Sequence, residues 1–351
     1  SLDGAAAFVC SDWAQIGADV LIEGELSARD EVVVEYRLRD VSRCKGLQRK
    51  KYRGAWENLK LIAARIADDV VEELTGRAGV ASTKIAFIAR EKENKELYLM
   101  DADGGDVRPV TQNGSINTFP SWAPDGSAVL YTSYRSLSQP GLFLVQRGAG
   151  SSGRILADAG GGGAQYRGVF SPDGKRVALV VSVDGAPEIF TVRRNGRDLR
   201  RLTHHPAIDI SPTWSPDGKQ IAFVSDRAGA PQIYLMDADG ENVRRVTFQG
   251  SYNSAPAWSP DGQWLAYESR VRGQFDIWLI DPAGTVNVPI VTHRRSDEGP
   301  TWSPDSRKIA FSSNRRGQYD IYAVDVNGTN LKRLTQQLGD ETSPAWGPYA
   351  R

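Results

Sequence analysis

The chain has 351 residues, and its 43 Lys and Arg balance its 43 Asp and Glu, so the formal net charge is zero. This balance removes the simplest electrostatic reason to expect a nucleic-acid or anionic-membrane partner. A hydrophobic content of 40% and a charged content of 25% are typical of a globular protein, and no run approaches the roughly 18 apolar residues of a membrane-spanning helix.

The first 80 residues are predicted to form a small α/β domain. Ser11 is placed to cap a short helix over 12–17, and the alternating segments 18–27 and 31–40 predict strands, with 46–54 as a third. A helix is predicted over 56–75, with a stop at Gly76, because apolar residues recur at helical spacing: Leu59, Ile62, Ile66, Val70 and Leu74. "GRAGVAS" (76–82) is interpreted as the linker to a second domain, residues 81–351.

Both cysteines, Cys10 and Cys44, lie in this first domain. Two cysteines do not make a disulfide framework, so two free, half-buried thiols are the simpler expectation. A disulfide between them is the alternative if the chain folds in an oxidising compartment.

The second domain contains a repeat marked by an aromatic residue at 122, 170, 214, 258, 302 and 346. The steps are 48, 44, 44, 44 and 44 residues, a spacing typical of propeller blades. One unit, residues 211–254, divides into four short strands and three turns, which is the content of one blade.

Each aromatic residue precedes a turn of the type WSPDG. Proline fixes φ early in the turn, and the closing glycine suits a left-handed conformation. We expect the ring to pack between neighbouring blades and the Asp side chain to accept a backbone N–H of its turn. Five acids are therefore interpreted as structural: Asp125, Asp173, Asp217, Asp261 and Asp305.

The two ends of the repeat complement each other. Residues 84–111 lack a first strand, and "SPAWGPYAR" (343–351) supplies a first strand with nothing after it. The prediction is therefore a mainly β fold: a six-bladed β-propeller whose C-terminal strand closes the first blade, preceded by the small α/β domain. Closure would remove open sheet edges.

Recognition is predicted in the D-to-A loops, which join the outermost strand (D) of one blade to the innermost strand (A) of the next. These loops vary while the SPDG turns repeat, and variable loops on a regular scaffold commonly carry function. Because aromatic and Arg side chains often anchor interfaces, ten loop residues are candidate partner contacts: His204, His205, Phe248, Tyr252, Asn253, His293, Arg294, Arg295, Asp297 and Glu298. Ordinary polar loops are the alternative.

A cation in the propeller channel is a second hypothesis. Asp209, Glu298 and Glu341 are predicted to lie beside the innermost strands, where carboxylate oxygens would suit Ca²⁺. Ordinary hydrated acids are the alternative, and no other cofactor is predicted. With three histidines and no Gly-x-Ser-x-Gly, His-Glu-x-x-His or Cys-x-x-Cys motif, the sequence predicts no catalytic residues.

Several segments resemble the TolB family of the Tol–Pal cell-envelope system. They are "DWAQIGADVLIEGEL" (12–26), "DDVVEELTG" (68–76), "TKIAFIAR" (83–90) and the closing "PAWGPY" (344–349), so that the resemblance covers essentially the whole chain. It implies a non-enzymatic, monomeric periplasmic protein that binds a Pal-like lipoprotein at the propeller mouth and contacts inner-membrane Tol proteins through its N-terminal domain. The implied role is protein transport, outer-membrane integrity and cell division.

The chain also departs from that family. Members usually begin with a further strand and helix, which residues 1–80 are expected to lack. The segment 148–170 holds the four-residue excess of the repeat and is rich in glycine, but it lacks the Lys-Ser/Thr of a phosphate-binding loop. WSPDG repeats occur in other proteins too, so two alternatives stay open: the propeller of a prolyl-oligopeptidase-like serine peptidase, and a propeller that binds a small ligand.

Overall fold

The computed structural model describes residues 9–28, 30–135, 139–147, 152–154, 163–183, 185–336 and 338–349. The chain divides into two compact units, Ser1–Ser82 and Thr83–Arg351, a boundary two residues beyond the predicted one. Most of the glycine-rich stretch 148–163 lies outside the described residues. Within the described residues, no helix is both long and apolar enough to cross a membrane.

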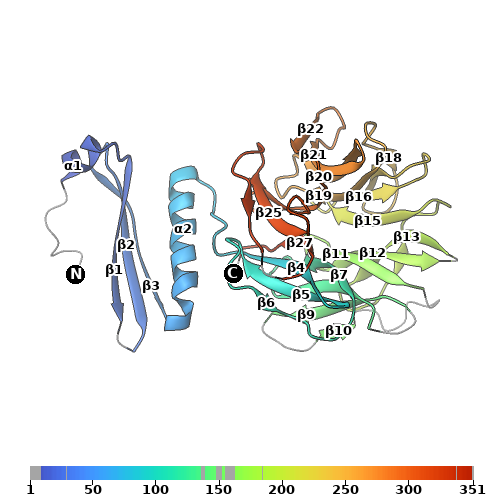
Figure 1. Cartoon of the computed structure of the whole chain (residues 1–351), viewed down its shortest axis with the longest axis horizontal. Coiled ribbons are helices and arrows are strands. Elements are labelled where there is room, and N and C mark those ends of the chain that lie inside the picture. Colours follow the sequence, from blue (N-terminus) through green and yellow to red (C-terminus); the bar gives the residue numbers. More distant parts are fainter. Residues whose placement is uncertain are drawn as a thin grey trace. The chain divides into compact units, whose positions relative to one another are not determined.

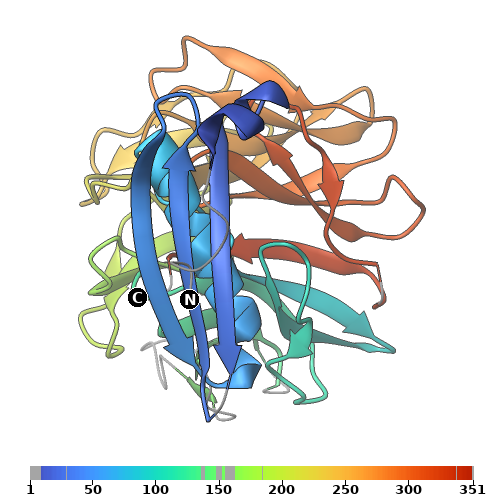
Figure 2. The ribbon, with the colours of Figure 1, turned by 90° about the vertical axis from the view of Figure 1, so that its left-hand side faces the viewer.

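The first unit is a three-stranded antiparallel sheet with one long helix. Its elements are α1 (Cys10–Gln15), β1 (Val20–Ala28), β2 (Val32–Asp40), β3 (Lys45–Gly54), the 3₁₀ turn η1 (Trp56–Asn58) and α2 (Leu59–Thr75). The strand order is β1-β2-β3, and α2 packs on β2 and β3 (Figure 2). Gly76 ends α2 in the left-handed conformation, φ 71°, as predicted. The prediction that Ser11 caps the short helix is wrong, because Ser11 lies inside α1 and Val9 holds the N-cap position without a side-chain hydrogen bond.

A buried carboxylate holds α2 on the sheet. Asp69 of α2 accepts hydrogen bonds from Tyr36 Oη of β2 at 3.0 Å, from Lys50 Nζ of β3 at 2.5 Å, and from Tyr52 Oη of β3. Burial opposes ionisation of Asp69, but these donors outweigh it, so the pKa of this carboxyl lies below its usual value. Apolar contacts add to these bonds, since Ile62 is buried and Leu59, Ile66 and Val70 are half-buried.

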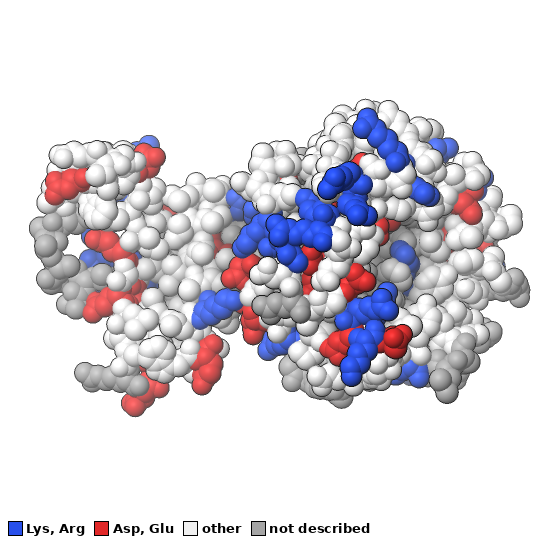
Figure 3. Space-filling view, viewed as in Figure 1, with Lys and Arg blue, Asp and Glu red and all other residues white. Residues whose placement is uncertain are grey.

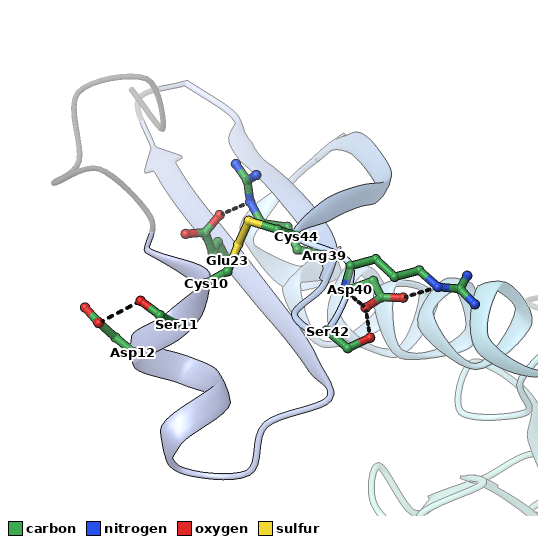
Figure 4. The surroundings of a disulfide bond; sticks show 9 residues. Cys10, Ser11, Asp12, Glu23, Arg39, Asp40, Ser42 and Cys44 are labelled. Atoms are coloured by element: carbon green, nitrogen blue, oxygen red, sulfur yellow. Dashed lines mark hydrogen bonds and ion pairs between the residues drawn. A yellow bond between two sulfur atoms is a disulfide. The ribbon is translucent and has the colours of Figure 1, made fainter.

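Cys10 and Cys44 form a disulfide, so the expectation of two free thiols is wrong (Figure 4). The bond joins α1 to the turn between β2 and β3, with a Cα–Cα distance of 5.7 Å. An ion pair between Arg39 and Glu23, 3.0 Å apart, lies beside it. The helix α1 buries none of its six residues, which explains why a covalent tie is needed to hold it on the sheet.

The described residues of the second unit form six four-stranded antiparallel sheets around a common axis (Figure 1). We call them blades 1 to 6 and give their strands from the axis outward. Blade 1 comprises β27 (Glu341–Trp346), β4 (Lys84–Glu91), β5 (Asn94–Asp101) and β6 (Arg108–Pro109). Blade 2 comprises β7 (Asn117–Trp122), β8 (Ala128–Ser133), β9 (Gly141–Gln146) and β10 (Ser152–Arg154).

Blades 3 to 6 follow in chain order. Blade 3 comprises β11 (Gln165–Phe170), β12 (Arg176–Val183), β13 (Ala186–Arg193) and β14 (Arg200–Arg201), and blade 4 comprises β15 (Asp209–Trp214), β16 (Gln220–Ser225), β17 (Gln232–Asp237) and β18 (Arg244–Arg245). Blade 5 comprises β19 (Asn253–Trp258), β20 (Leu265–Val271), β21 (Gln274–Ile280) and β22 (Asn287–Val291), and blade 6 comprises β23 (Asp297–Trp302), β24 (Lys308–Ser313), β25 (Asp320–Asp325) and β26 (Lys332–Arg333).

The repeated aromatic residues and acids are structural, as predicted. Trp214 packs with side chains of blades 3 and 4, and Trp302 with side chains of blades 5 and 6. In the turn after Trp214, Asp217 Oδ1 accepts the hydroxyl of Ser215 at 2.7 Å and the backbone N–H of Lys219 at 3.0 Å. All five acids accept the same backbone N–H, two residues later.

Every inner strand bends at its third residue. The register with the next strand shifts at this point, and the third residue takes a positive φ between 49° and 62°. These six residues are Phe119, Arg167, Ser211, Ala255, Gly299 and Ser343. We call them the bulge ring; it divides each inner strand into a half near the D-to-A loops and a half near the SPDG turns.

Candidate functional site

The D-to-A loops are braced by the B-to-C loops, which join the second and third strands of each blade. In blade 4, Asp226 Oδ1 accepts the backbone N–H of Ile208 at 2.8 Å, and in blade 6, Asn314 Oδ1 accepts that of Ser296 at 3.0 Å. The two sets of loops therefore share one face, as predicted. These bonds hold the loops in a defined shape.

The ten predicted contact residues differ in burial. His204, Phe248, Arg294 and Arg295 are exposed, and His205, Tyr252, His293 and Glu298 are half-buried. Phe248 is the most apolar of the exposed group, with 70% of its surface accessible. Asn253 and Asp297 are 0% exposed, so the prediction that they contact a partner is wrong.

The half-buried residues stiffen the loops. Nδ1 of both His205 and His293 accepts a backbone N–H from two residues later, each at 3.1 Å. Tyr252 meets the edge of Phe275, with ring centroids 5.6 Å apart. Glu298 accepts the hydroxyl of Tyr319 at 2.6 Å. Each of these two histidines therefore uses its Nδ1 to stabilise its own loop.

The exposed residues are of the type that anchors interfaces. The Arg245 guanidinium lies 5.0 Å from the centroid of the Phe248 ring and supports it from one side. Arg294 and Arg295 form no ion pair with any described residue, so their guanidinium groups are free to bind a partner. On the face of this unit that Figure 3 shows, basic and acidic side chains lie beside one another among mostly uncharged residues.

The first residue of every inner strand is polar and at most 2% exposed: Asn117, Gln165, Asp209, Asn253, Asp297 and Glu341. Asn253 shows their role. Its Nδ2 donates to Gln232 Oε1 of blade 4 at 2.7 Å, and Thr247 Oγ1 donates to the same atom at 2.9 Å. The side chain thus joins blade 5 to blade 4, and a partner has no access to it.

The three acids predicted to hold a cation are not brought together. Asp209 pairs with Arg227 at 2.8 Å, Glu341 accepts the backbone N–H of Leu338 at 3.2 Å, and Glu298 is bound by a tyrosine. Burial raises the pKa of Asp209 and of Glu341. Over the part of the chain that the structure describes, no three His, Cys, Asp or Glu side chains lie close enough together to hold a metal ion.

A channel of about 570 Å³ runs along the other half of the inner strands. It is lined by the third, fourth and fifth residues of these strands, by Trp122, Trp302 and Trp346, and by the prolines of the six turns that follow, from Pro124 to Pro348. The bulge ring lies at its inner end and includes one charged residue, Arg167. The sequence analysis did not name Arg167 as a site residue. A signal was present, because the other five inner strands have a proline at their fourth position, where this strand has Gly168 after Arg167.

Two family models match the chain. One, described as the TolB beta propeller domain, covers residues 71–350, and the other, described as the TolB amino-terminal domain, covers residues 2–47. The chain belongs to the TolB family. The matched ranges fall on the second and the first unit of the fold, in that order.

Curated and solved TolB proteins agree with this assignment. The Tol-Pal system protein TolB of Anaeromyxobacter dehalogenans is 38% identical over 203 residues, which are 58% of this chain and 46% of that protein. That of Desulfosudis oleivorans is 37% identical over 195 residues, 55% of this chain and 43% of that protein. The matched region thus spans less than half the length of these TolB relatives.

The crystal structure of TolB from Acinetobacter baumannii matches 98% of this chain and 86% of its own, with a TM-score of 0.88 and 26% identity. An oligogalacturonate lyase in complex with manganese matches with a TM-score of 0.51 over 71% of this chain and 73% of its own. At 17% identity, this second likeness shows only that a propeller fold is shared, not an enzymatic activity.

Proposed function

We propose that this TolB-family chain is a non-enzymatic component of a Tol–Pal system and binds a Pal-like lipoprotein through its D-to-A loops. The observation that carries the proposal is the combination of both TolB domains in one chain, with a solved TolB matching 98% of it. In this proposal the six sheets are the blades of a closed six-bladed ring, and the molecule is a monomer. It supports protein transport, outer-membrane integrity and cell division.

The binding surface would be the exposed part of the D-to-A loops. Phe248 offers an accessible ring, and Arg294 and Arg295 offer unpaired guanidinium groups, so the surface combines an apolar anchor with hydrogen-bond donors. Because the loops are braced, little conformational entropy would be lost on binding. The N-terminal unit would be left for contacts with inner-membrane Tol proteins.

The disulfide supports a periplasmic location. Cys10 and Cys44 are joined in the structure, and such bonds persist in oxidising compartments such as the bacterial periplasm. The engagement of His205 and His293 with their own loops supports a role without catalysis. The proposal therefore assigns no catalytic residue and no cofactor.

A pull-down with purified Pal tests the proposal. We expect the variant Phe248→Ala, Arg294→Glu, Arg295→Glu to lose roughly 2 kcal/mol or more of binding free energy, because it removes an anchor and reverses two charges. The matched control, Val243→Ala, Arg197→Glu, Lys219→Glu, makes the same kinds of change at exposed positions in the turns of the opposite face. Equal affinity of the two variants for Pal would contradict the proposed surface.

A further inference from the structure

The channel behind the SPDG turns is separate from the D-to-A loops and has no role in the proposed function. Its volume of about 570 Å³ lies within the range of pockets that enclose small molecules. Proline is the most frequent residue of its wall, which also contains Trp122, Trp302 and Trp346. Such a wall suits an apolar or aromatic molecular body.

Arg167 places one positive charge in this apolar channel. Its guanidinium lies 3.8 Å from the centroid of the Phe119 ring, and its Nη1 donates to Ser211 Oγ. Both neighbours belong to the bulge ring, so the group is fixed across the channel. With the described residues Arg167 forms no ion pair, and its Nε and Nη2 donate to none of them.

Glu268 attracts Arg167 electrostatically, but the two form no ion pair. Instead Glu268 accepts the hydroxyl of Ser254 at 2.5 Å and the backbone N–H of Gly299 at 2.8 Å, and Glu298 is bound by Tyr319. Burial raises the pKa of Glu268. Burial also lowers the pKa of Arg167 and outweighs the attraction of Glu268.

Packing does not require an arginine at this position. The equivalent residues of blades 4, 5 and 1 are Ser211, Ala255 and Ser343, so a small side chain suffices at the bulge. Gly168 has a packing reason, because a Cβ there would lie 2.8 Å from Leu130 and Leu142. Placing a guanidinium in an apolar channel is costly unless an anion compensates it.

We propose that the channel binds a small organic monocarboxylate with an apolar body, whose carboxylate takes the free donors of Arg167. The planar guanidinium matches a carboxylate in a forked hydrogen-bonded pair. A single negative charge balances Arg167, whereas a phosphate dianion would leave one charge uncompensated in the apolar channel. The apolar body lies along the proline and tryptophan wall.

Calorimetric titration of the full chain with phenylacetate and with the neutral phenylacetamide tests this inference, and tryptophan fluorescence reports on the channel wall. We expect phenylacetate to bind at least about tenfold more tightly, which corresponds to about 1.4 kcal/mol. Arg167→Gln is expected to abolish this preference, while the control Arg272→Gln, at an exposed residue in the turn between β20 and β21, keeps it. Arg167→Lys retains the charge without the fork and is expected to weaken it.

Equal binding of the acid and the amide by the unmodified chain would overturn the inference without recourse to any variant. The inference would also be overturned if Arg167→Gln still bound phenylacetate more tightly than phenylacetamide by the same factor. If Arg167→Gln does not fold, the same result in Arg167→Lys would overturn it. Competition by inorganic phosphate as strong as that by phenylacetate would overturn the choice of a monocarboxylate. Because the channel and the loops share no tested residue, failure here leaves the Pal-binding proposal standing, and the converse also holds.

Discussion

Burial separates side chains that the sequence groups together. Arg294 and Asp297 are three residues apart and were both candidate contacts, yet Arg294 is exposed while Asp297 is 0% exposed and pairs with Arg315 at 2.8 Å. A polar residue at a strand start ordinarily indicates exposure. Here it enters the seam between two blades, where burial and the Asp297 carboxylate together raise the pKa of Asp276. Arg315 lies 18 residues further along blade 6 and Asp276 lies in blade 5, so neighbouring sequence could not show these contacts.

Substitution of these two residues should have different effects on stability. Asp297→Ala leaves the Arg315 guanidinium, 12% exposed, without its carboxylate, and should lower the free energy of unfolding by about 3–5 kcal/mol. Arg294→Ala should change it by less than about 0.5 kcal/mol, because the side chain is exposed and unpaired. Urea unfolding followed by tryptophan fluorescence measures both values. A cost below about 1 kcal/mol for Asp297→Ala would show that the ion pair between Asp297 and Arg315 does not stabilise the fold.

Arg167 is a residue that the sequence could have revealed. Five inner strands have Pro at the fourth position, after Phe119, Ser211, Ala255, Gly299 or Ser343, and the sixth has Arg167-Gly168. Comparison of the repeats at this position, rather than at the WSPDG turn alone, marks the exception. Its place in the channel could not be predicted, because it depends on the bulge that turns the third residue of every inner strand to a positive φ.

At the scale of elements, the helix α2 was predictable from its apolar stripe and from Gly76, but its attachment was not. Ile62 is the one fully buried residue of the stripe, and the polar Asp69 adds hydrogen bonds to β2 and β3 that the stripe does not indicate. The short helix α1 was also expected, yet its cap and the state of Cys10 were wrong, because a disulfide rather than a capping side chain fixes it. Tertiary bonds between distant residues decide both cases.

The attachment of α2 should depend on pH through Asp69. The pKa of Asp69 is lower in the folded unit than the ordinary value of 3.8, so its contribution is fully present above about pH 4 and is lost as pH falls through the folded value. Asp69→Asn should therefore speed hydrogen exchange of the α2 amides at pH 7, with a cost of about 1–3 kcal/mol. The difference from the unmodified chain should shrink at lower pH. Glu72→Gln, an exposed change on the same helix, is the control, and equal exchange in both variants at pH 7 would contradict the assignment.

At the scale of the whole molecule, the period of 44 residues predicted the repeated sheets, because each unit carries its own strands and turns. The pairing of β27 with β4 brings Trp346 opposite Ile85, residues from opposite ends of the second unit. Further bonds cross the same place: Trp346 Nε1 donates to Thr83 Oγ1 at 2.8 Å, and Trp122 Nε1 donates to the carbonyl of Ala345 at 3.0 Å. The sequence indicated the partner strands but not these contacts.

Gly347 tests whether this junction stabilises the entire ring. Its N–H donates to the carbonyl oxygen of Lys84 at 2.8 Å, and a Cβ would lie 2.9 Å from the Trp122 ring and 3.0 Å from that oxygen. Gly347→Ala should therefore lower the free energy of unfolding by about 1–3 kcal/mol through overpacking. Gly153→Ala lies in the outermost strand of blade 2, where no atom of a described residue comes within 4 Å of the new Cβ, and should change it by less than about 0.5 kcal/mol. If closure makes the blades unfold together, near-ultraviolet circular dichroism in urea will show one transition that moves to lower urea in Gly347→Ala with an unchanged slope. A separate early transition confined to part of the signal would instead mean that blade 1 opens by itself and that the closing strand does not couple the ring.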